Sequence, residues 1–269
     1  MRISCVTLLL DFLAMAGNRS AAALGTLFCL ATASAQGAPI GPDQLYASDG
    51  GGKLYALDAV TGGGALVGSG SWVGAGLAFA PSGELYASNG GGALYRLDPV
   101  TGGGTLIGAG SWVGSGLAFA PTGELYASNG GGKLYRLDPS TGVGTLMGSG
   151  GWVGSGLAFA PTGTLYASNG GGKLYELDLS TGGGTLIGSG GWVGAGLAFA
   201  STGELYASNG GGKLYELDPS TGGGTLIGSG SWVGSGLAFS PIPEPSSPLL
   251  ASLGLAGLGV RGRRFATAR

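Results

Sequence analysis

The stretch "SWVGSGLAFAPTGELYASNGGGKLY", from Ser111 to Tyr135, recurs with few changes along most of the 269-residue chain. Its tryptophan marks the repeat, because five tryptophans follow one another at intervals of 40 residues without an insertion, at Trp72, Trp112, Trp152, Trp192 and Trp232. Four segments of one unit are apolar or aromatic and too short for stable helices, so they favour β-strands; they are Gly116–Ala120, Glu124–Ser128, Lys133–Asp138 and Thr145–Ser149. Four strands in 40 residues are typical of one β-propeller blade.

The residues between these segments have the composition of tight turns. "APTG" places Pro121 second and Gly123 fourth, as type I turns prefer. Asn129-Gly130 predicts a hairpin turn, because both residues tolerate positive φ. In "DPSTG", the Asp138 side chain is expected to accept hydrogen bonds from backbone amides two residues further on.

The two ends of the repeat region predict a closed ring. The first unit begins at Gln44–Ser48, the second strand of the pattern, and the last ends at Gly236–Ser240, the first strand. Three strands from the N-terminus and one from the C-terminus would then complete a fifth blade. We therefore predict an all-β, five-bladed β-propeller of four-stranded blades over residues 44–240. The alternatives are an open β-solenoid, which would need polar capping repeats, and a poorly folded glycine-rich array.

Composition argues against several kinds of site. The chain has no histidine, and its two cysteines, Cys5 and Cys29, precede the expected mature start. The usual zinc ligands and histidine-based triads are therefore missing, and we expect no metal site, cofactor or catalytic residue. An active site also usually combines different groups, whereas near-identical units supply the same group repeatedly. Between residues 36 and 240, twelve acidic residues outnumber six basic ones, so we expect no nucleic-acid partner.

The N-terminal region has the features of an export signal. Arg19 precedes an apolar run, "AAALGTLFCLATA", from Ala21 to Ala33. The small residues Ala33 and Ala35 then form the "ASA" pattern that signal peptidase requires, with cleavage expected after Ala35. Signal peptidase is therefore an expected processing partner.

These features divide the N-terminal region into a signal peptide over residues 1–35 and a linker over residues 36–43. We expect translation to start at Met15, because Asp11 interrupts the apolar run that precedes it. The alternative is a long amino-terminal extension of the signal that begins at Met1.

The repeat unit resembles two kinds of propeller repeat. "GLAFAPTGELYASNGGGKLYRLD", from Gly116 to Asp138, resembles an NHL-type repeat, and "GGKLYALDAVTGG", from Gly51 to Gly63, is similar to the quinoprotein (PQQ-like) repeat. Both resemblances imply the propeller fold. A quinoprotein enzyme would further imply a bound quinone with metal-ligating and base residues at non-equivalent positions, and no such residues are found. This enzyme class is therefore the least favoured alternative.

The C-terminal segment, residues 241–269, resembles the PEP-CTERM sorting signal of exosortase-processed bacterial proteins. The matching features, in order, are Pro243, Glu244 and Pro245, an apolar segment at Leu249–Val260, and Arg261, Arg263 and Arg264. The resemblance implies an exported protein of a Gram-negative, polysaccharide-producing bacterium, anchored transiently in the inner membrane by a C-terminal transmembrane helix until exosortase processes it. The apolar segment has only 12 residues, fewer than the roughly 20 that span a bilayer, although the arginines fit a positive-inside stop. The alternative is a short apolar tail without sorting.

The tryptophans and asparagines of the repeat are candidates for ligand contact. In an up-and-down blade, the connection that leaves the fourth strand and the hairpin between the second and third strands lie on one face. The indoles would then ring the mouth of the central channel, where aromatic faces stack on sugars. The possible glycan-binding residues are Trp72, Trp112, Trp152, Trp192 and Trp232, with Asn89, Asn129, Asn169 and Asn209. The alternative is that each tryptophan packs between neighbouring blades.

Taken together, these features predict a non-enzymatic protein secreted through the inner membrane to the cell surface or extracellular matrix. We expect it to act as a structural or interaction scaffold associated with exopolysaccharide, and to be processed by exosortase. The alternative is a multivalent, lectin-like, glycan-binding propeller.

Overall fold

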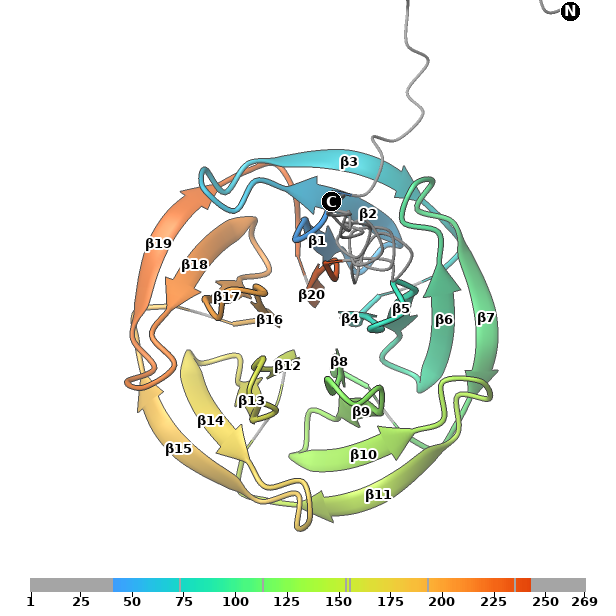
Figure 1. The fold of residues 1–269 in the computed structure, drawn as a ribbon, viewed down its shortest axis with the longest axis vertical. Coiled ribbons are helices and arrows are strands. Elements are labelled where there is room, and N and C mark those ends of the chain that lie inside the picture. Colours follow the sequence, from blue (N-terminus) through green and yellow to red (C-terminus); the bar gives the residue numbers. More distant parts are fainter. Residues whose placement is uncertain are drawn as a thin grey trace, which may run out of the picture. The chain divides into compact units, whose positions relative to one another are not determined.

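A computed structural model describes residues 41–242 apart from residues 73, 113, 153, 155, 193 and 235. The expected signal peptide and most of the expected sorting segment, from Pro243 onward, lie outside these residues. The described chain forms five four-stranded antiparallel sheets arranged as blades around a ring (Figure 1). The predicted all-β, five-bladed propeller is therefore confirmed.

Each blade runs from an innermost strand at the ring axis to an outermost strand at the circumference. Blade A consists of β20 (Gly236–Phe239), β1 (Leu45–Ser48), β2 (Lys53–Leu57) and β3 (Gly64–Ser69). Blade B consists of β4 (Gly76–Phe79), β5 (Leu85–Ser88), β6 (Ala93–Leu97) and β7 (Gly104–Ala109). Blade C consists of β8 (Gly116–Phe119), β9 (Leu125–Ser128), β10 (Lys133–Leu137) and β11 (Gly144–Ser149). Blade D consists of β12 (Gly156–Phe159), β13 (Leu165–Ser168), β14 (Lys173–Leu177) and β15 (Gly184–Ser189). Blade E consists of β16 (Gly196–Phe199), β17 (Leu205–Ser208), β18 (Lys213–Leu217) and β19 (Gly224–Ser229).

Blade A closes the ring as predicted, because its innermost strand comes from the C-terminal side of the chain. β20 pairs antiparallel with β1, in a register that runs from Leu45 opposite Phe239 to Ser48 opposite Gly236. The pairing continues beyond the strands, where the amide of Ser240 donates to the carbonyl of Gln44 at 2.9 Å. The first and last strands of the ring are thereby joined in one sheet.

The hairpin between the second and third strands is built differently from the prediction. In blade C, the side-chain oxygen of Asn129 accepts from the amides of Gly131 and Lys133, at 3.0 and 2.8 Å. The positive φ belongs to Gly132, at 76°, and not to Asn129 or Gly130. A Cβ on Gly132 would also lie 1.9 Å from the carbonyl oxygen of Trp152. Glycine is therefore required at this position both for its conformation and for the close approach of the next connection.

One departure from the repeat lies where the ring closes. Blades B, C and D have proline after the innermost strand, at Pro81, Pro121 and Pro161, but blade E has Ser201. The amide and hydroxyl of Ser201 donate to the two carboxylate oxygens of Asp43, each at 3.0 Å. A proline would have no amide to donate. Asp43 and Ser201 therefore tie the N-terminal side of the ring to blade E.

Replacing Ser201 with proline is expected to lower the free energy of unfolding by about 1 kcal/mol, because two exposed hydrogen bonds to a carboxylate are lost. The loss should appear in urea unfolding even though a compatible proline usually stabilises a turn by about 0.4–1 kcal/mol. Pro161→Ser in blade D is the control, because it makes the opposite exchange in a turn that Asp43 does not contact. In that variant only the stiffness of the turn changes. A Ser201→Pro protein as stable as the parent would contradict a stabilising role for this contact.

Candidate functional site

The five tryptophans lie in the core and not at the mouth of a channel. Each indole is 0–1% exposed. Each follows an outermost strand and donates its Nε1–H across to the next blade, to a carbonyl in the hairpin between the third and fourth strands. The acceptors, at 2.7–2.8 Å, are the carbonyl oxygens of Gly102, Gly142, Gly182, Gly222 and Gly62 in ring order.

The surroundings of Trp72 show why no sugar could stack on it. Its hydrophobic cluster includes Tyr46 and Leu54 of blade A and Leu85 of blade B, so the indole fills the space between two blades. A Cβ on Gly104 of blade B would lie 2.5 Å from the indole Cδ1. The indole faces are therefore covered by protein. This geometry corrects the expectation that the tryptophans ring the channel mouth and fits the alternative, in which they pack between blades.

The candidate asparagines hold their own hairpins. The side-chain oxygens of Asn89, Asn129, Asn169 and Asn209 each accept two backbone amides at 2.8–3.0 Å. Blade A has Asp49 at this position, and its carboxylate accepts the same two bonds, from Gly51 and Lys53. What the position requires is an acceptor oxygen, which an amide or a carboxylate supplies equally. Their hydrogen bonds therefore assign these residues a role in shaping the loop.

A bowl lies on the ring axis at the ends of the innermost strands, where the "APTG" hairpins begin. It has a volume of about 470 Å³, within the range of small-molecule sites. Five partly exposed phenylalanines repeat around it, at Phe79, Phe119, Phe159, Phe199 and Phe239. Asp43, Ser201 and Ser240 line the bowl where blades E and A meet, so one sector is polar while the rest is apolar.

The bowl narrows inward along the ring axis. Beyond the phenylalanines lies a space of about 90 Å³, lined by leucines, alanines and phenylalanines of the innermost strands. The next space, at the glycines that begin these strands, has only about 10 Å³, room for about one water. A Cβ on Gly76 would lie 2.8 Å from the backbone nitrogen of Leu117 in the next blade, so these strands almost touch. The channel is therefore open at the phenylalanine end and nearly closed at the other.

Each phenylalanine of the bowl is held by a tyrosine from the preceding blade. The ring centroids of Tyr126 and Phe159, for example, are 5.4 Å apart with a tilt of 57°, and the other four pairs are alike. Burial raises the pKa of Tyr126, so its hydroxyl is protonated at neutral pH. Such tilted aromatic pairs stabilise the blade interface and fix the orientation of the phenylalanine ring.

The repeated aspartates after the third strands are turn caps, as predicted. Asp138 accepts from the amide of Ser140 at 2.8 Å, and Asp98 from that of Val100 at 2.8 Å. Bonds of this kind favour the charged form. In Asp218, the Ser220 hydroxyl and then the Ser220 amide lower the pKa to about 2. These carboxylates therefore stay ionised and occupied by their own turns at neutral pH.

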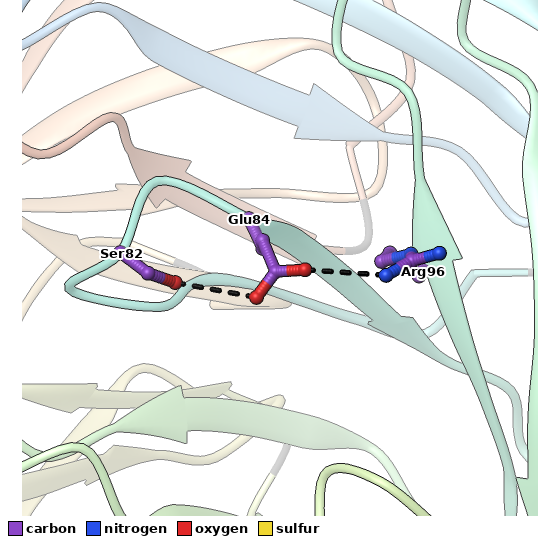
Figure 2. A network of polar contacts seen from close by, with 3 residues as sticks. All are labelled: Ser82, Glu84 and Arg96. Atoms are coloured by element: carbon purple, nitrogen blue, oxygen red, sulfur yellow. Dashed lines mark hydrogen bonds and ion pairs between the residues drawn. The ribbon is translucent and has the colours of Figure 1, made fainter.

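Blade B carries three exposed polar side chains that are linked by hydrogen bonds. The Glu84 carboxylate accepts from Ser82 and from Arg96, both at 3.3 Å (Figure 2). The Arg96 and Glu84 side chains are 59% and 47% exposed, so water screens the ion pair and it contributes little to stability. The equivalent residues in blade C are Glu124 and Arg136, whereas blade D has threonine and glutamate.

Two further kinds of feature are absent from residues 41–242. No three histidine, cysteine, aspartate or glutamate side chains gather there as a metal site would require. The same part of the chain contains no helix long and apolar enough to cross a membrane. The expected membrane segment, Leu249–Val260, lies outside the described residues, as do the sorting residues from Pro243 to Arg264 and the cleavage site at Ala33–Ala35.

The phenylalanine bowl was not predicted from the sequence. Its signal was available, since the same "GLAF" forms the innermost strand of every blade and alternate residues of a strand point to opposite faces. Which face borders the axis depends on how the blades tilt in the ring. The strand sequence alone does not specify that tilt.

Comparison with known proteins bears mainly on the C-terminal segment. The PEP-CTERM protein-sorting motif matches residues 241–264, which confirms the predicted motif. No curated protein matches the chain. Among solved structures, hydrazine synthase of Kuenenia stuttgartiensis is similar at 17% identity with a TM-score of 0.42, over 56% of this chain and 47% of that one. A likeness this low supports no argument about function, and the NHL-like or PQQ-like repeat type stays a prediction. The chain therefore carries a PEP-CTERM sorting motif that begins at Pro241, directly after the strand that closes its propeller.

Proposed function

We propose that this protein is an exported, exosortase-processed, non-enzymatic scaffold of the cell surface or extracellular matrix, associated with exopolysaccharide. The observation that carries the proposal is the sorting motif at residues 241–264, directly beyond the closing strand of a ring of near-identical blades. The motif itself indicates secretion and processing by exosortase. The scaffold role goes further and rests on the geometry of the ring, and the association with polysaccharide rests on what the PEP-CTERM resemblance implies.

The contacts that close the ring end short of both expected cleavage sites. The last of them joins the Ser240 hydroxyl to the carbonyl of Gly41 at 2.8 Å. Cleavage after Ala35, or near Pro243-Glu244-Pro245, would break none of the described contacts. A ring closed before sorting would therefore stay closed after it, as a secreted scaffold requires.

The absence of an enzymatic role is supported by what the polar groups do. The aspartates after the third strands are engaged by their own turns, as Asp138 is with Ser140. The buried tyrosines have raised pKa values, because burial disfavours the phenolate. A catalytic site would need at least one group left available and activated by a neighbour. The repeated aspartates and tyrosines of the described blades do not meet this requirement, because the aspartates are held by their turns and the tyrosines stay protonated.

Processing is tested by mass spectrometry of the protein recovered from the producing cell's extracellular material. We expect peptides from the ring and none that extend much beyond Ser246. A variant with alanine at Pro243, Glu244 and Pro245 is the matched control and is expected to remain in the membrane fraction. Recovery of chains that still contain Arg269 from the extracellular fraction would overturn the sorting part of the proposal.

Glycan binding remains the alternative, and one observation favours it. The axial bowl presents five partly exposed phenylalanines, and aromatic rings can stack on the apolar faces of sugars. The site would then lie in the bowl and not at the tryptophans. A polysaccharide pull-down with Phe159→Ala, which removes one ring of the five, distinguishes this alternative: a scaffold without a glycan site in the bowl would bind as the parent does.

A further inference from the structure

The circumference of the ring is formed by the five outermost strands, β3, β7, β11, β15 and β19 (Figure 1). We call these the rim strands. Each is the last strand of its sheet and pairs with a neighbour on one side only. The other edge of such a strand has backbone N–H and C=O groups that can pair with another strand.

The rim strands lack the charged residues and prolines that protect many such edges. Edge strands are commonly guarded by lysine or another charge, or by proline. None of the rim-strand residues is charged or a proline, since the five sequences are GALVGS, GTLIGA, GTLMGS, GTLIGS and GTLIGS. Charged residues occur on the strands directly inside the rim, so their absence from the rim is local.

Each rim strand also presents one exposed leucine. The residue after it points inward, as Ile107 does where it packs against the core cluster of blades B and C. The leucine lies on the opposite side of the strand, in solvent. The exposed fractions are 58% for Leu66, 56% for Leu106, 52% for Leu146, 50% for Leu186 and 50% for Leu226. An apolar side chain therefore accompanies an open backbone edge in every blade.

Two features shorten the open edge. The pairing of each rim strand with its inner neighbour contains a β-bulge, which in blade C lies between Leu134 and Tyr135. A bulge bends the strand and so interrupts its regular outer edge. The end of each rim strand is also covered by the hairpin of the next blade, because a Cβ on Gly108 would lie 2.1 Å from the carbonyl oxygen of Thr141. The accessible part is the first four residues of each strand, Gly104–Ile107 in blade B.

The charges just inside the rim differ between the two halves of the ring. The middle of the third strand carries Arg96 and Arg136 in blades B and C, but Glu176 and Glu216 in blades D and E. If two rim strands paired, the third strands would lie three strand spacings apart, about 14 Å. The third strands of blades D and E also begin with a lysine, Lys173 and Lys213, so these strands are neutral overall, and Arg96 is already paired with Glu84. At that distance these charges therefore neither select nor exclude a partner blade.

We propose that the rim strands bind a second copy of this chain, edge to edge, and that rings assemble laterally through these contacts. Two rim strands related by a two-fold axis run antiparallel, so an edge can pair with the same edge of another copy. Because the rim strands are nearly identical and carry no charge, two copies can pair without repulsion between like charges, and each copy brings an exposed leucine to the contact. Five equivalent rim strands allow one ring to hold several neighbours. The proposal deepens the proposed scaffold function. Only the biological purpose of the assembly rests on that function, because the geometry of the rim strands does not depend on sorting.

The test is sedimentation velocity of the purified full chain over a wide range of protein concentration. Two variants with the same added charge are compared with the parent. In the rim variant, lysine replaces Leu106, Leu146, Leu186 and Leu226. In the off-rim variant, lysine replaces four exposed residues of the hairpins that follow the innermost strands, Ser82, Thr122, Thr162 and Thr202. Matching circular dichroism and melting temperature establish that all three proteins are folded.

We expect the parent and the off-rim variant to associate as concentration rises. The rim variant should associate at least about tenfold more weakly, because each contact loses an apolar group and gains a repelled charge. A parent that stays monomeric throughout, or two variants that lose association equally, would overturn the proposal. Because the readout is association of purified protein, a failed sorting experiment would leave this result unaffected, and the reverse also holds.

Discussion

Replacing Trp152 with alanine is expected to lower the free energy of unfolding by about 3–5 kcal/mol, the range for removing a fully buried large side chain. The indole is 0% exposed and packs against Leu134 of blade C and Leu157 of blade D. Its Nε1–H also donates to the carbonyl of Gly182 at 2.8 Å. The variant would lose this bond as well and leave a cavity between two blades.

The measurement is denaturant unfolding of Trp152→Ala beside Leu146→Ala. Leu146 belongs to the same blade but is 52% exposed, so its replacement should change stability by about 0.5 kcal/mol or less. A polysaccharide pull-down on the same two proteins supplies the second readout. A large loss of stability with unchanged binding by the remaining folded protein is the expected result. Normal stability with lost binding would mean that the indole contacts a ligand and does not serve the core.

The strands and the closure of the ring were predictable because local chemistry specifies both. Segments such as "GLAF" and "LYAS" are too short for helices, and the residues between them favour turns. The strand boundaries fall within one residue of the prediction in blade C, where β8 ends at Phe119 and β11 begins at Gly144. Closure followed from the offset of the chain ends, which needs no knowledge of side-chain packing.

The location of the tryptophans could not be predicted in the same way. An indole can pack in a hydrophobic core or stack on a sugar ring. The repeat places it in the connection after the fourth strand, where either role is compatible with the sequence. What decides the matter is three-dimensional: the Gly102 carbonyl receives the Nε1–H of Trp72, and Gly104 leaves space for the ring. These residues follow tryptophan by 30 and 32 positions and belong to the next blade.

The role of Ser201 and Asp43 was equally hidden. A serine in place of a turn proline is an unremarkable change in a repeat, and Asp43 lies 158 residues away. Only the closed ring brings them together. The candidate bowl was missed for a similar reason, because Phe159 borders the axis through the tilt of its blade.

Deleting Gly236–Ser240, which removes β20, is expected to destabilise the entire ring. Leu237 is 2% exposed and belongs to a core cluster with Trp232, and Phe239 contacts Tyr206 at a centroid distance of 5.3 Å. Burying each of these side chains contributes about 1.5–3 kcal/mol. The deletion also removes the Ser240 contacts and exposes the inner edge of β1. Because β20 adjoins β4 and β16, its two neighbours around the axis, the loss extends to blades B and E.

Thermal unfolding of that deletion variant, beside a chain that ends at Ile242, tests the closed ring most directly. The chain ending at Ile242 keeps β20 and every described closing contact, and it should melt cooperatively at the temperature of the parent. The variant without Gly236–Ser240 should unfold at a much lower temperature, or lack a cooperative transition, because each blade depends on its neighbours around the ring. A deletion variant that melts like the parent would contradict closure and indicate an open array that only frays at one end.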